Sequence, residues 1–133
     1  MNRLETILVV DDEVTICRLV STMLEREGYC VLKAESSADA LGQIENWGKS
    51  IDLLVTDVRM RGMDGLCLAR EFEFRFPAAR VLLMSGYLGP SRRIEGVFPE
   101  TWEYLAKPFS LSEFVSRVER ILHGVITPFP EKQ

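Results

Sequence analysis

Short apolar runs alternate with stretches of helical periodicity along the chain. A continuous apolar run is typical of a strand covered on both faces, and apolar positions three or four residues apart are typical of a helix with one buried face. The pattern predicts strands at Thr6–Val10, Tyr29–Ala34, Ile51–Thr56, Arg80–Met84 and Trp102–Leu105. It predicts helices at Val14–Glu27, from a cap at Ser36 or Ser37 to about Trp47, at Leu66–Phe76, and from the capping box Ser110–Glu113 to just before Gly124.

Two local features refine this pattern. The first helix is expected to turn one face toward the core, formed by Ile16, Leu19, Val20, Met23 and Leu24. The segment Gly86–Glu100 breaks the alternation, because it contains three glycines and two prolines. We therefore expect at most a turn or two of helix there, over Ser91–Glu95.

Alternating strands and helices predict an α/β fold, in which a parallel sheet carries helices on both faces. Ligands of such sheets bind at the carboxyl ends of the strands, at the topological switch point. The polar residues that follow the predicted strands therefore point to the site. They are Asp11 and Asp12, Asp57, Ser85 and Lys107.

Composition favours one ordinary globular domain. The chain has 133 residues, 47% of them hydrophobic, which is enough for a proper core. The formal net charge is -4, and the basic residues are scattered rather than gathered in a stripe, so nucleic acid is not an expected partner. Arg92 and Arg93 could make a local contact, although a solvated loop is the simpler interpretation. We expect the domain to cover residues 1–124, with 125–133 as a tail or linker containing Pro128 and Pro130.

Cysteine usage and the N-terminus indicate a cytoplasmic location. Cys17, Cys30 and Cys67 are odd in number and lack a metal-ligand spacing, so free and mostly buried thiols in a reducing compartment are expected. We expect no signal peptide, because Met1–Glu5 lacks a long apolar segment with a cleavage site, and no apolar run approaches the roughly 20 residues that cross a bilayer.

The clustered carboxylates predict a divalent cation. Like charges a few ångströms apart raise each other's pKa, so three carboxylates need a counter-charge. Magnesium prefers oxygen ligands and commonly takes one or two carboxylates. We expect Asp12 and Asp57 as direct ligands, Asp11 acting through a water, and the backbone carbonyl of Arg59 as a further oxygen donor.

The same residues predict phosphoryl chemistry. A carboxylate can attack phosphorus, and a cation and a lysine can offset the charge that develops. Lys107 and Ser85 are the candidates to contact a phosphoryl group. Each piece alone has a plainer interpretation, since Asp12 could be only a helix cap and a Lys-Pro pair only a turn. His123 near the end of the last helix is expected to be an ordinary surface residue.

In this order and spacing, the motifs resemble the receiver domain of two-component response regulators. They are Val9-Val10-Asp11-Asp12-Glu13, Asp57-Val58-Arg59-Met60 with Gly62-Met63-Asp64-Gly65, Met84-Ser85-Gly86 and Lys107-Pro108-Phe109, and the resemblance spans about Thr6 to His123. It implies a flavodoxin-like, doubly wound five-stranded sheet in the order 2-1-3-4-5, and a cis Lys107-Pro108 bond.

The resemblance also implies a mechanism. Asp57 would be the phosphoacceptor, with magnesium held by Asp11, Asp12 and Asp57. A histidine kinase or histidine phosphotransfer domain would donate the phosphoryl group. Ser85 and Lys107 would contact it, and Ser85 and Tyr104 would then reposition to switch a signalling surface. Such a domain is not a turnover enzyme, because it only phosphorylates itself and slowly loses the group.

Three departures from the family pattern stand out. Arg61 occupies a position where proline is common, which would loosen the loop after Asp57. Arg59 could cover the phosphoryl group and alter its hydrolysis, or simply point to solvent. The irregular Leu88–Thr101 segment weakens the carry-over of the homodimer surface that many receivers build there, and it resembles segments of receivers attached to hybrid histidine kinases.

Two other classes compete with this interpretation. Phosphohydrolases with an aspartate nucleophile carry an Asp-x-Asp motif, but Arg59 stands at the position of its second aspartate, and we expect no cap domain. A degenerate receiver used only for docking would not need Asp11, Asp12, Asp57, Ser85 and Lys107, all of which are intact.

Overall fold

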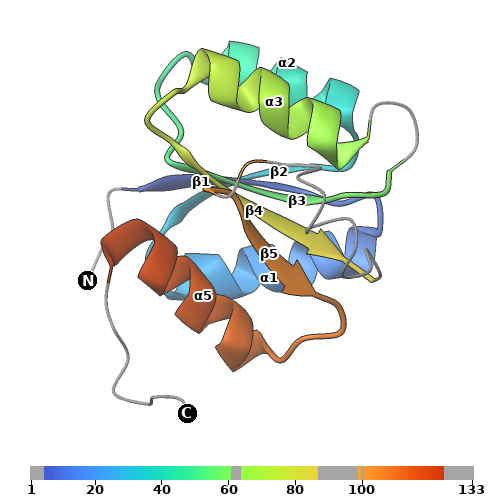
Figure 1. Cartoon of the computed structure of the whole chain (residues 1–133), viewed down its shortest axis with the longest axis vertical. Coiled ribbons are helices and arrows are strands. Elements are labelled where there is room, and N and C mark those ends of the chain that lie inside the picture. The colour runs from blue at the N-terminus through green and yellow to red at the C-terminus, as the bar shows by residue number, and fades with distance from the viewer. Residues whose placement is uncertain (1–4, 61–63, 87–98, 100, 125–133) are drawn as a thin grey trace.

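The protein folds as a three-layered α/β sandwich around a parallel sheet (Figure 1). The computed structural model describes residues 5–60, 64–86, 99 and 101–124. The strands are β1 (Thr6–Val10), β2 (Cys30–Ala34), β3 (Leu53–Asp57), β4 (Arg80–Ser85) and β5 (Glu103–Ala106). The helices are α1 (Val14–Arg26), α2 (Ser37–Trp47), α3 (Gly65–Arg75) and α5 (Leu111–His123).

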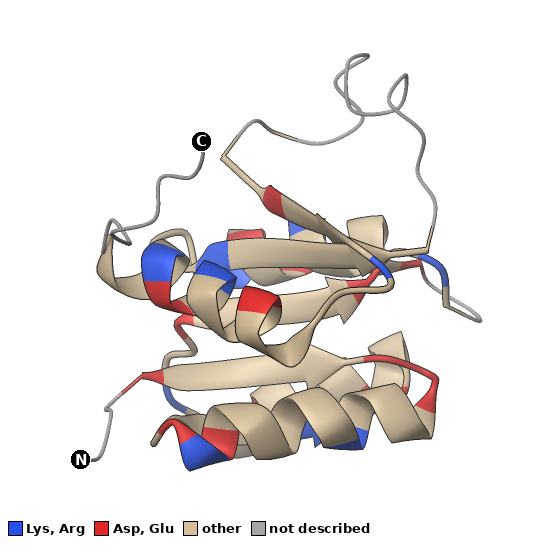
Figure 2. Ribbon diagram, turned by 90° about the horizontal axis from the view of Figure 1, so that it is seen from below, with Lys and Arg blue, Asp and Glu red and all other residues tan. Residues whose placement is uncertain are grey.

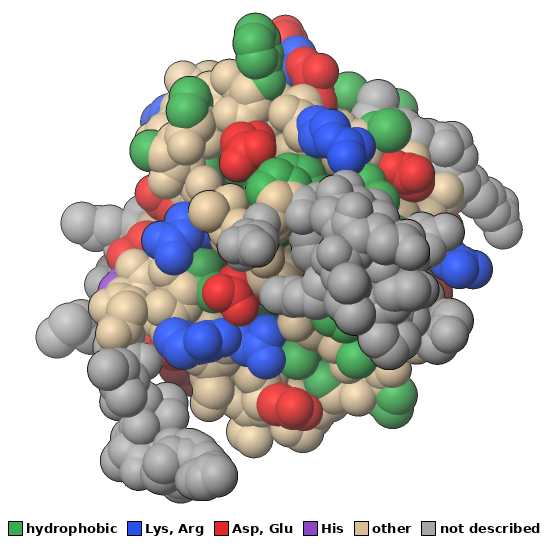
Figure 3. All heavy atoms as spheres, viewed as in Figure 1, with side chains coloured by type: hydrophobic (Ala, Val, Ile, Leu, Met, Phe, Trp, Pro, Cys, Tyr) green, Lys and Arg blue, Asp and Glu red, His purple; other side chains and the backbone are tan. Residues whose placement is uncertain are grey.

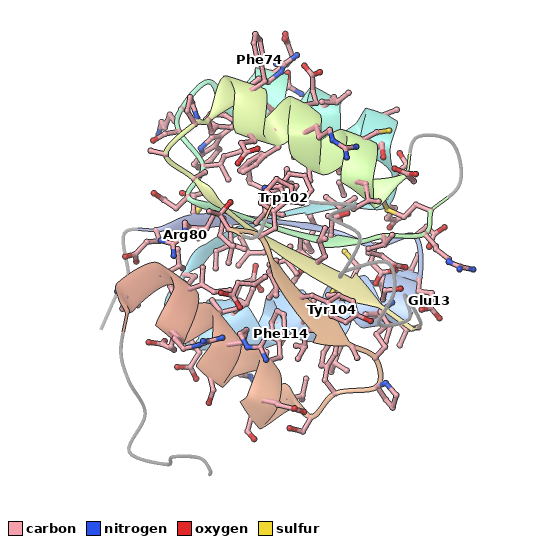
Figure 4. All side chains as sticks on the ribbon, in the orientation of Figure 1. Glu13, Phe74, Arg80, Trp102, Tyr104 and Phe114 are labelled. Atoms are coloured by element: carbon pink, nitrogen blue, oxygen red, sulfur yellow. The ribbon has the colours of Figure 1, made fainter. Side chains whose placement is uncertain are left out.

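The strand order is β2-β1-β3-β4-β5, and every neighbouring pair is parallel. The predicted doubly wound sheet is therefore confirmed. Helices α2 and α3 cover one face and α1 and α5 the other, as Figure 1 shows above and below the sheet. Each face has its own apolar core, with Phe72 and Trp102 on the α2–α3 side and Leu24 and Phe114 on the α1–α5 side. Figure 4 shows Trp102 and Phe114 on these two sides of the sheet.

Capping residues account for several helix boundaries. The Ser36 hydroxyl accepts from the Asp39 N–H at 3.0 Å, which selects Ser36 as the cap of α2. The predicted capping box is present at α5, where Ser110 and Glu113 bond reciprocally. Gly124 ends α5 with φ 64°, a left-handed conformation that glycine adopts without steric cost.

The predicted inward position of Leu19 is wrong. Its side chain is 47% exposed, whereas Cys17, Val20, Ser21 and Leu24 are the buried positions of α1. The helix is rotated so that the line through Cys17, Val20 and Leu24 faces the sheet. Leu19 is left on the flank, where it lines a groove of about 530 Å³ beside Phe109.

The expectation of mostly buried thiols is also wrong. All three cysteines are free, but only Cys17 is buried. Cys30 lies on β2, an edge strand, and Cys67 is exposed on α3, so packing covers neither residue.

Several expectations lie outside the described residues. They are the turn of helix at Ser91–Glu95, the pair Arg92 and Arg93, the loop position Arg61 and the tail at 125–133. Within the described part of the chain, no helix is long and apolar enough to span a membrane. On the face in Figure 3, the described acidic and basic side chains are interspersed.

Candidate functional site

The predicted site residues meet at the carboxyl edge of the sheet. Asp11 directly follows β1, and Asp57 is the last residue of the adjacent strand β3. Figure 2 shows acidic and basic positions gathered where the strand arrows end. Asp11, Asp12 and Asp57 each offer a carboxylate oxygen, and these oxygens all lie within 4.8 Å of one another. The predicted juxtaposition of the three carboxylates is thus present.

The Asp11 carboxylate is fixed by hydrogen bonds on both of its oxygens. The side chain is fully buried, with 0% exposure. Its Oδ1 accepts from the Glu13 N–H at 2.9 Å, and its Oδ2 accepts from Lys107 Nζ at 3.0 Å. A buried carboxylate without such partners would be costly, so these two bonds satisfy the polar oxygens of Asp11 inside the fold.

Asp12 is exposed at the rim of the site. The plainer interpretation of this residue, as the cap of α1, is wrong, because Glu13 is the N-cap and no side-chain capping bond is made there. Asp12 directly follows Asp11 after the end of β1, which brings its carboxylate to the other two.

Lys107 brings one ammonium to the carboxylates. Its Nζ lies 3.0 Å from Asp11 Oδ2, 3.4 Å from Asp57 Oδ2 and 3.4 Å from Glu13 Oε1. Burial by itself lowers the pKa of Lys107, but the hydrogen bond and charge of Asp11, together with Asp57, outweigh burial and raise it. The ammonium is therefore firmly charged at neutral pH.

The backbone around Lys107 is also held. Its N–H donates to the Ser85 carbonyl at 2.8 Å, which ties the end of β5 to the end of β4. The bond to Pro108 is cis, as the family resemblance implied. The hydrogen bond to Ser85 fixes the backbone of Lys107 just after β5, beside the end of β4.

Asp57 lies in a pocket that disfavours its charge. Burial, and then the nearby charge of Asp11, raise the pKa of the Asp57 carboxyl, while Lys107 and the backbone N–H of Arg59 act in the opposite direction. The net pKa is raised. A carboxylate that is partly desolvated is a stronger nucleophile than one that water surrounds, so the pocket suits covalent chemistry at Asp57.

Hydrogen bonds hold the end of β3, which carries Asp57, to both β4 and the start of α3. The Val58 N–H donates to the Met84 carbonyl at 2.9 Å, and the Gly65 N–H donates to the Val58 carbonyl at 2.8 Å. The Thr56 hydroxyl donates to the Asp57 carbonyl at 3.0 Å. Helix α3 therefore starts directly against the backbone of Asp57.

Ser85 and Tyr104 lie on the two strands beyond β3. Ser85 is 1% exposed at the end of β4 and follows Met84, which is the register partner of Asp57. Tyr104 is half-buried on β5, beside Leu83 of β4, and its carbonyl accepts from Arg117 Nη1 at 2.9 Å. Strand β4 lies directly beside β3, whose end carries Asp57, and β5 lies beside β4. The roles of Ser85 and Tyr104 as contact and switch residues remain predictions.

Two contributors to the site were missed from sequence. Glu13 contacts Lys107, and its only signal was a third acidic residue after Asp11 and Asp12. Gly65 lets α3 approach Asp57, because a Cβ there would lie 2.0 Å from the Asp57 carbonyl oxygen. Its signal was a glycine at the start of a helix, where a residue with higher helix propensity is usual.

A doubly wound parallel sheet with an acidic pocket and a lysine at its carboxyl edge defines a class of phosphate-handling α/β domains. Within that class the chain belongs to the response regulator receiver domain family, whose model matches residues 7–119. It is therefore a receiver domain of two-component signal transduction.

Individual relatives agree with this assignment. The chain is 34% identical over 116 residues to the transcriptional regulatory protein ZraR of Salmonella typhimurium, covering 87% of this chain and 26% of that protein. It is 33% identical to the transcriptional regulatory protein AruR of Pseudomonas aeruginosa, covering 96% of this chain and 54% of that protein. A crystal structure of a response regulator receiver domain protein from Clostridium thermocellum has a TM-score of 0.78 and 31% identity, covering 91% of this chain and 96% of that one.

The chain thus spans about a quarter to about a half of the length of these curated relatives. Both are transcriptional regulatory proteins, so they do not support the origin in a hybrid histidine kinase that the resemblance of the Leu88–Thr101 segment made plausible.

Proposed function

We propose that Asp57 is the phosphoacceptor of this receiver, and that its phosphorylation switches a signalling surface. The observation that carries the proposal is the meeting of Asp11, Asp12 and Asp57 within 4.8 Å, with the Lys107 ammonium 3.4 Å from Asp57. These contacts join residues that are far apart in the sequence. A plain helix cap or turn would not need them.

The reaction is a transfer of a phosphoryl group between two nucleophiles. An oxygen of the Asp57 carboxylate attacks the phosphorus of a phosphohistidine, and an O–P bond forms while the N–P bond breaks. The imidazole nitrogen leaves with the electron pair of that bond. The product is an acyl phosphate on Asp57, and the partner is a histidine kinase or a histidine phosphotransfer domain.

The residues around Asp57 have distinct parts in this step. The Lys107 ammonium offsets charge on the phosphoryl oxygens as it moves from the carboxylate toward them. The Ser85 hydroxyl donates to one of those oxygens. Asp11 keeps Lys107 in place, because its contact at 3.0 Å does not depend on Asp57.

The donor set fits magnesium. Carboxylate oxygens that converge within 4.8 Å, one of them on an exposed residue, are hard ligands of the kind that this cation takes. Asp12 and Asp57 would bind it directly, Asp11 through a water, and the carbonyl of Arg59 would add an oxygen. When bound, Mg²⁺ supplies positive charge that neutralises the carboxylates and the incoming phosphoryl group.

The switch would run through β4 and β5. When Ser85 turns toward the phosphoryl group, the space beside it changes and Tyr104 repositions. The curated relatives described above are regulators, and we propose likewise that this domain signals through its surface and does not turn over a substrate. We place the receiver at residues 1–124 and a tail or linker at 125–133.

The test is phosphorylation by labelled acetyl phosphate with Mg²⁺. Asp57→Asn is expected to abolish incorporation, because the amide is not a nucleophile toward phosphorus. The matched control is Asp52→Asn, just before β3 at the opposite end of that strand, where an amide oxygen can still accept from the Thr6 N–H as the carboxylate does at 2.8 Å. Equal labelling of Asp57→Asn and wild type would refute the assignment.

A further inference from the structure

Glu13 makes a contact that helix formation does not explain. It is the N-cap of α1, yet its side chain caps nothing. Instead its Oε1 lies 3.4 Å from Lys107 Nζ, 94 residues away in the chain. Figure 4 shows Glu13 at the end of the sheet where the strand arrows of β4 and β5 point. The side chain thus links the start of α1 to the segment after β5.

This contact completes the coordination of the ammonium. A lysine ammonium has three N–H donors, and the structure places three carboxylates around it, from Asp11, Glu13 and Asp57. Lysine is a compact charge on a flexible stem, so partners and not stem rigidity define where its nitrogen lies. Asp11 holds it from the buried side, and Glu13, with a side chain 65% exposed, holds it from the rim.

The contact matters most when Asp57 reacts. On phosphorylation, the Asp57 oxygen becomes the bridging oxygen of an acyl phosphate, and the negative charge then lies on the phosphoryl oxygens. Lys107 then loses one of its three anchors and must follow that charge. Asp11, which is buried, and Glu13, which is at the exposed rim, are the two that remain, so they limit how far the nitrogen can move.

We infer that Glu13 is a positioning residue for phosphoryl transfer, which holds the Lys107 ammonium in line with the group that Asp57 receives. The inference rests on the proposed role of Asp57 and deepens it. Glu13 does not touch the phosphoryl group, so it acts through Lys107. Because Glu13 is largely exposed, its contact is of the modest kind made by surface ion pairs, and its loss corresponds to a rate change of about two- to fivefold.

A loss of positioning and a loss of negative charge would change the labelling rate in opposite directions. Glu13→Gln removes a negative charge near the site, which by itself would help an anionic phosphodonor to bind and would speed labelling. Loss of positioning would instead slow the step after binding. Whether the labelling rate at saturating phosphodonor rises or falls therefore distinguishes the two effects.

The experiment compares wild type, Glu13→Gln and Glu25→Gln with acetyl phosphate and Mg²⁺. Glu25 is an exposed carboxylate near the other end of α1, so its variant carries the same change in net charge. We expect the saturating rate of Glu13→Gln to fall about two- to fivefold, with no increase in the donor concentration at half-saturation. Glu25→Gln is expected to match wild type.

A second readout follows Lys107 directly. The chain has four lysines, so the side-chain NMR signals of Lys107 can be assigned with Lys107→Arg. Glu13→Gln should move the Lys107 signal and Glu25→Gln should not. An unchanged or faster saturating rate, or an unmoved Lys107 signal, overturns the role of Glu13 while leaving Asp57 as acceptor. No labelling of wild type would overturn the phosphoacceptor proposal itself, and this inference with it.

Discussion

Replacing Gly65 with alanine should damage the site through the backbone alone. Gly65 is the first residue of α3, and a Cβ at this position would lie 2.0 Å from the Asp57 carbonyl oxygen, 2.9 Å from its carbonyl carbon and 3.0 Å from Val58 Cα. All three atoms belong to the backbone of the strand end that carries the candidate nucleophile. No side chain can therefore rotate away to make room.

The geometry sets the size of the effect. Ordinary van der Waals contact begins at 3.4 Å, so the closest pair is about 1.4 Å too near and helix and strand must separate. Overpacking of this kind costs about 1–3 kcal/mol. Separation also stretches the bond from the Gly65 N–H to the Val58 carbonyl, worth about 1 kcal/mol. The higher helix propensity of alanine stabilises the helix by at most about 1 kcal/mol. We therefore expect the free energy of unfolding to fall by about 1–3 kcal/mol in total.

Urea unfolding of wild type, Gly65→Ala and Gly42→Ala measures this loss. Gly42 is an exposed residue of α2 with nothing within 4 Å of a built Cβ, so alanine there should stabilise by about 0.5–1 kcal/mol. Labelling by acetyl phosphate should also fall in Gly65→Ala, because Asp57 is displaced with its strand. If Gly65→Ala is as stable as Gly42→Ala, the close approach of α3 to Asp57 does not exist as described.

Three further perturbations test other parts of the fold. Ser110→Ala removes the hydroxyl that accepts from the Glu113 N–H at 3.0 Å and should cost about 1 kcal/mol in urea unfolding; a cost near zero would mean that solvent caps α5 equally well. Trp102→Phe removes the indole N–H that donates to Glu73 Oε2 at 3.2 Å, and with it part of a side chain that is only 2% exposed. Its free energy of unfolding should fall by about 1–3 kcal/mol. Glu73→Gln keeps an acceptor for the indole N–H, so its stability should fall much less. Asp57→Asn should stabilise the metal-free protein at neutral pH, because burial raises the pKa of Asp57 above its unfolded value and its ionised form is disfavoured in the fold. That penalty is absent below the unfolded-state pKa of Asp57 and develops as pH rises through its folded-state pKa. The free energies of unfolding of the two proteins, measured with urea across the acidic range, should therefore converge at low pH. A difference that stays constant with pH would contradict the raised pKa.

Much of the site could be predicted because it follows from strand ends. In a parallel sheet all carboxyl ends lie at one edge, so finding the polar residues after each strand was enough to bring Asp11, Asp57, Ser85 and Lys107 together. The boundaries moved by only one or two residues, with Asp57 and Ser85 ending their strands instead of following them. Local signals were equally dependable where a cap or a left-handed glycine defined a helix end, as at Ser110 and Gly124.

Contacts across the edge could not be predicted in the same way. Helical periodicity identifies an apolar stripe but not the rotation of the helix on the sheet, so Leu19 was expected inside and lies 47% exposed. Burial of Cys30 and Cys67 was inferred from residue type, although an edge strand and an outward helix face leave both exposed. The hydrogen bond from Trp102, just before β5, to Glu73 of α3 joins residues 29 positions apart, which no local pattern predicts.

The sequence by itself determined the alternation of strands and helices, the parallel sheet and the edge at which its acidic residues gather, because these depend on patterns of a few neighbouring residues. Only the tertiary structure decided that one ammonium contacts Asp11, Glu13 and Asp57, and that α3 starts against the Asp57 carbonyl. The partners of Lys107 lie 50 to 96 residues from it in the sequence, so only the packing of separate elements brings these atoms together. The start of α3 likewise depends on how closely the helix packs against the end of β3, which no local pattern specifies.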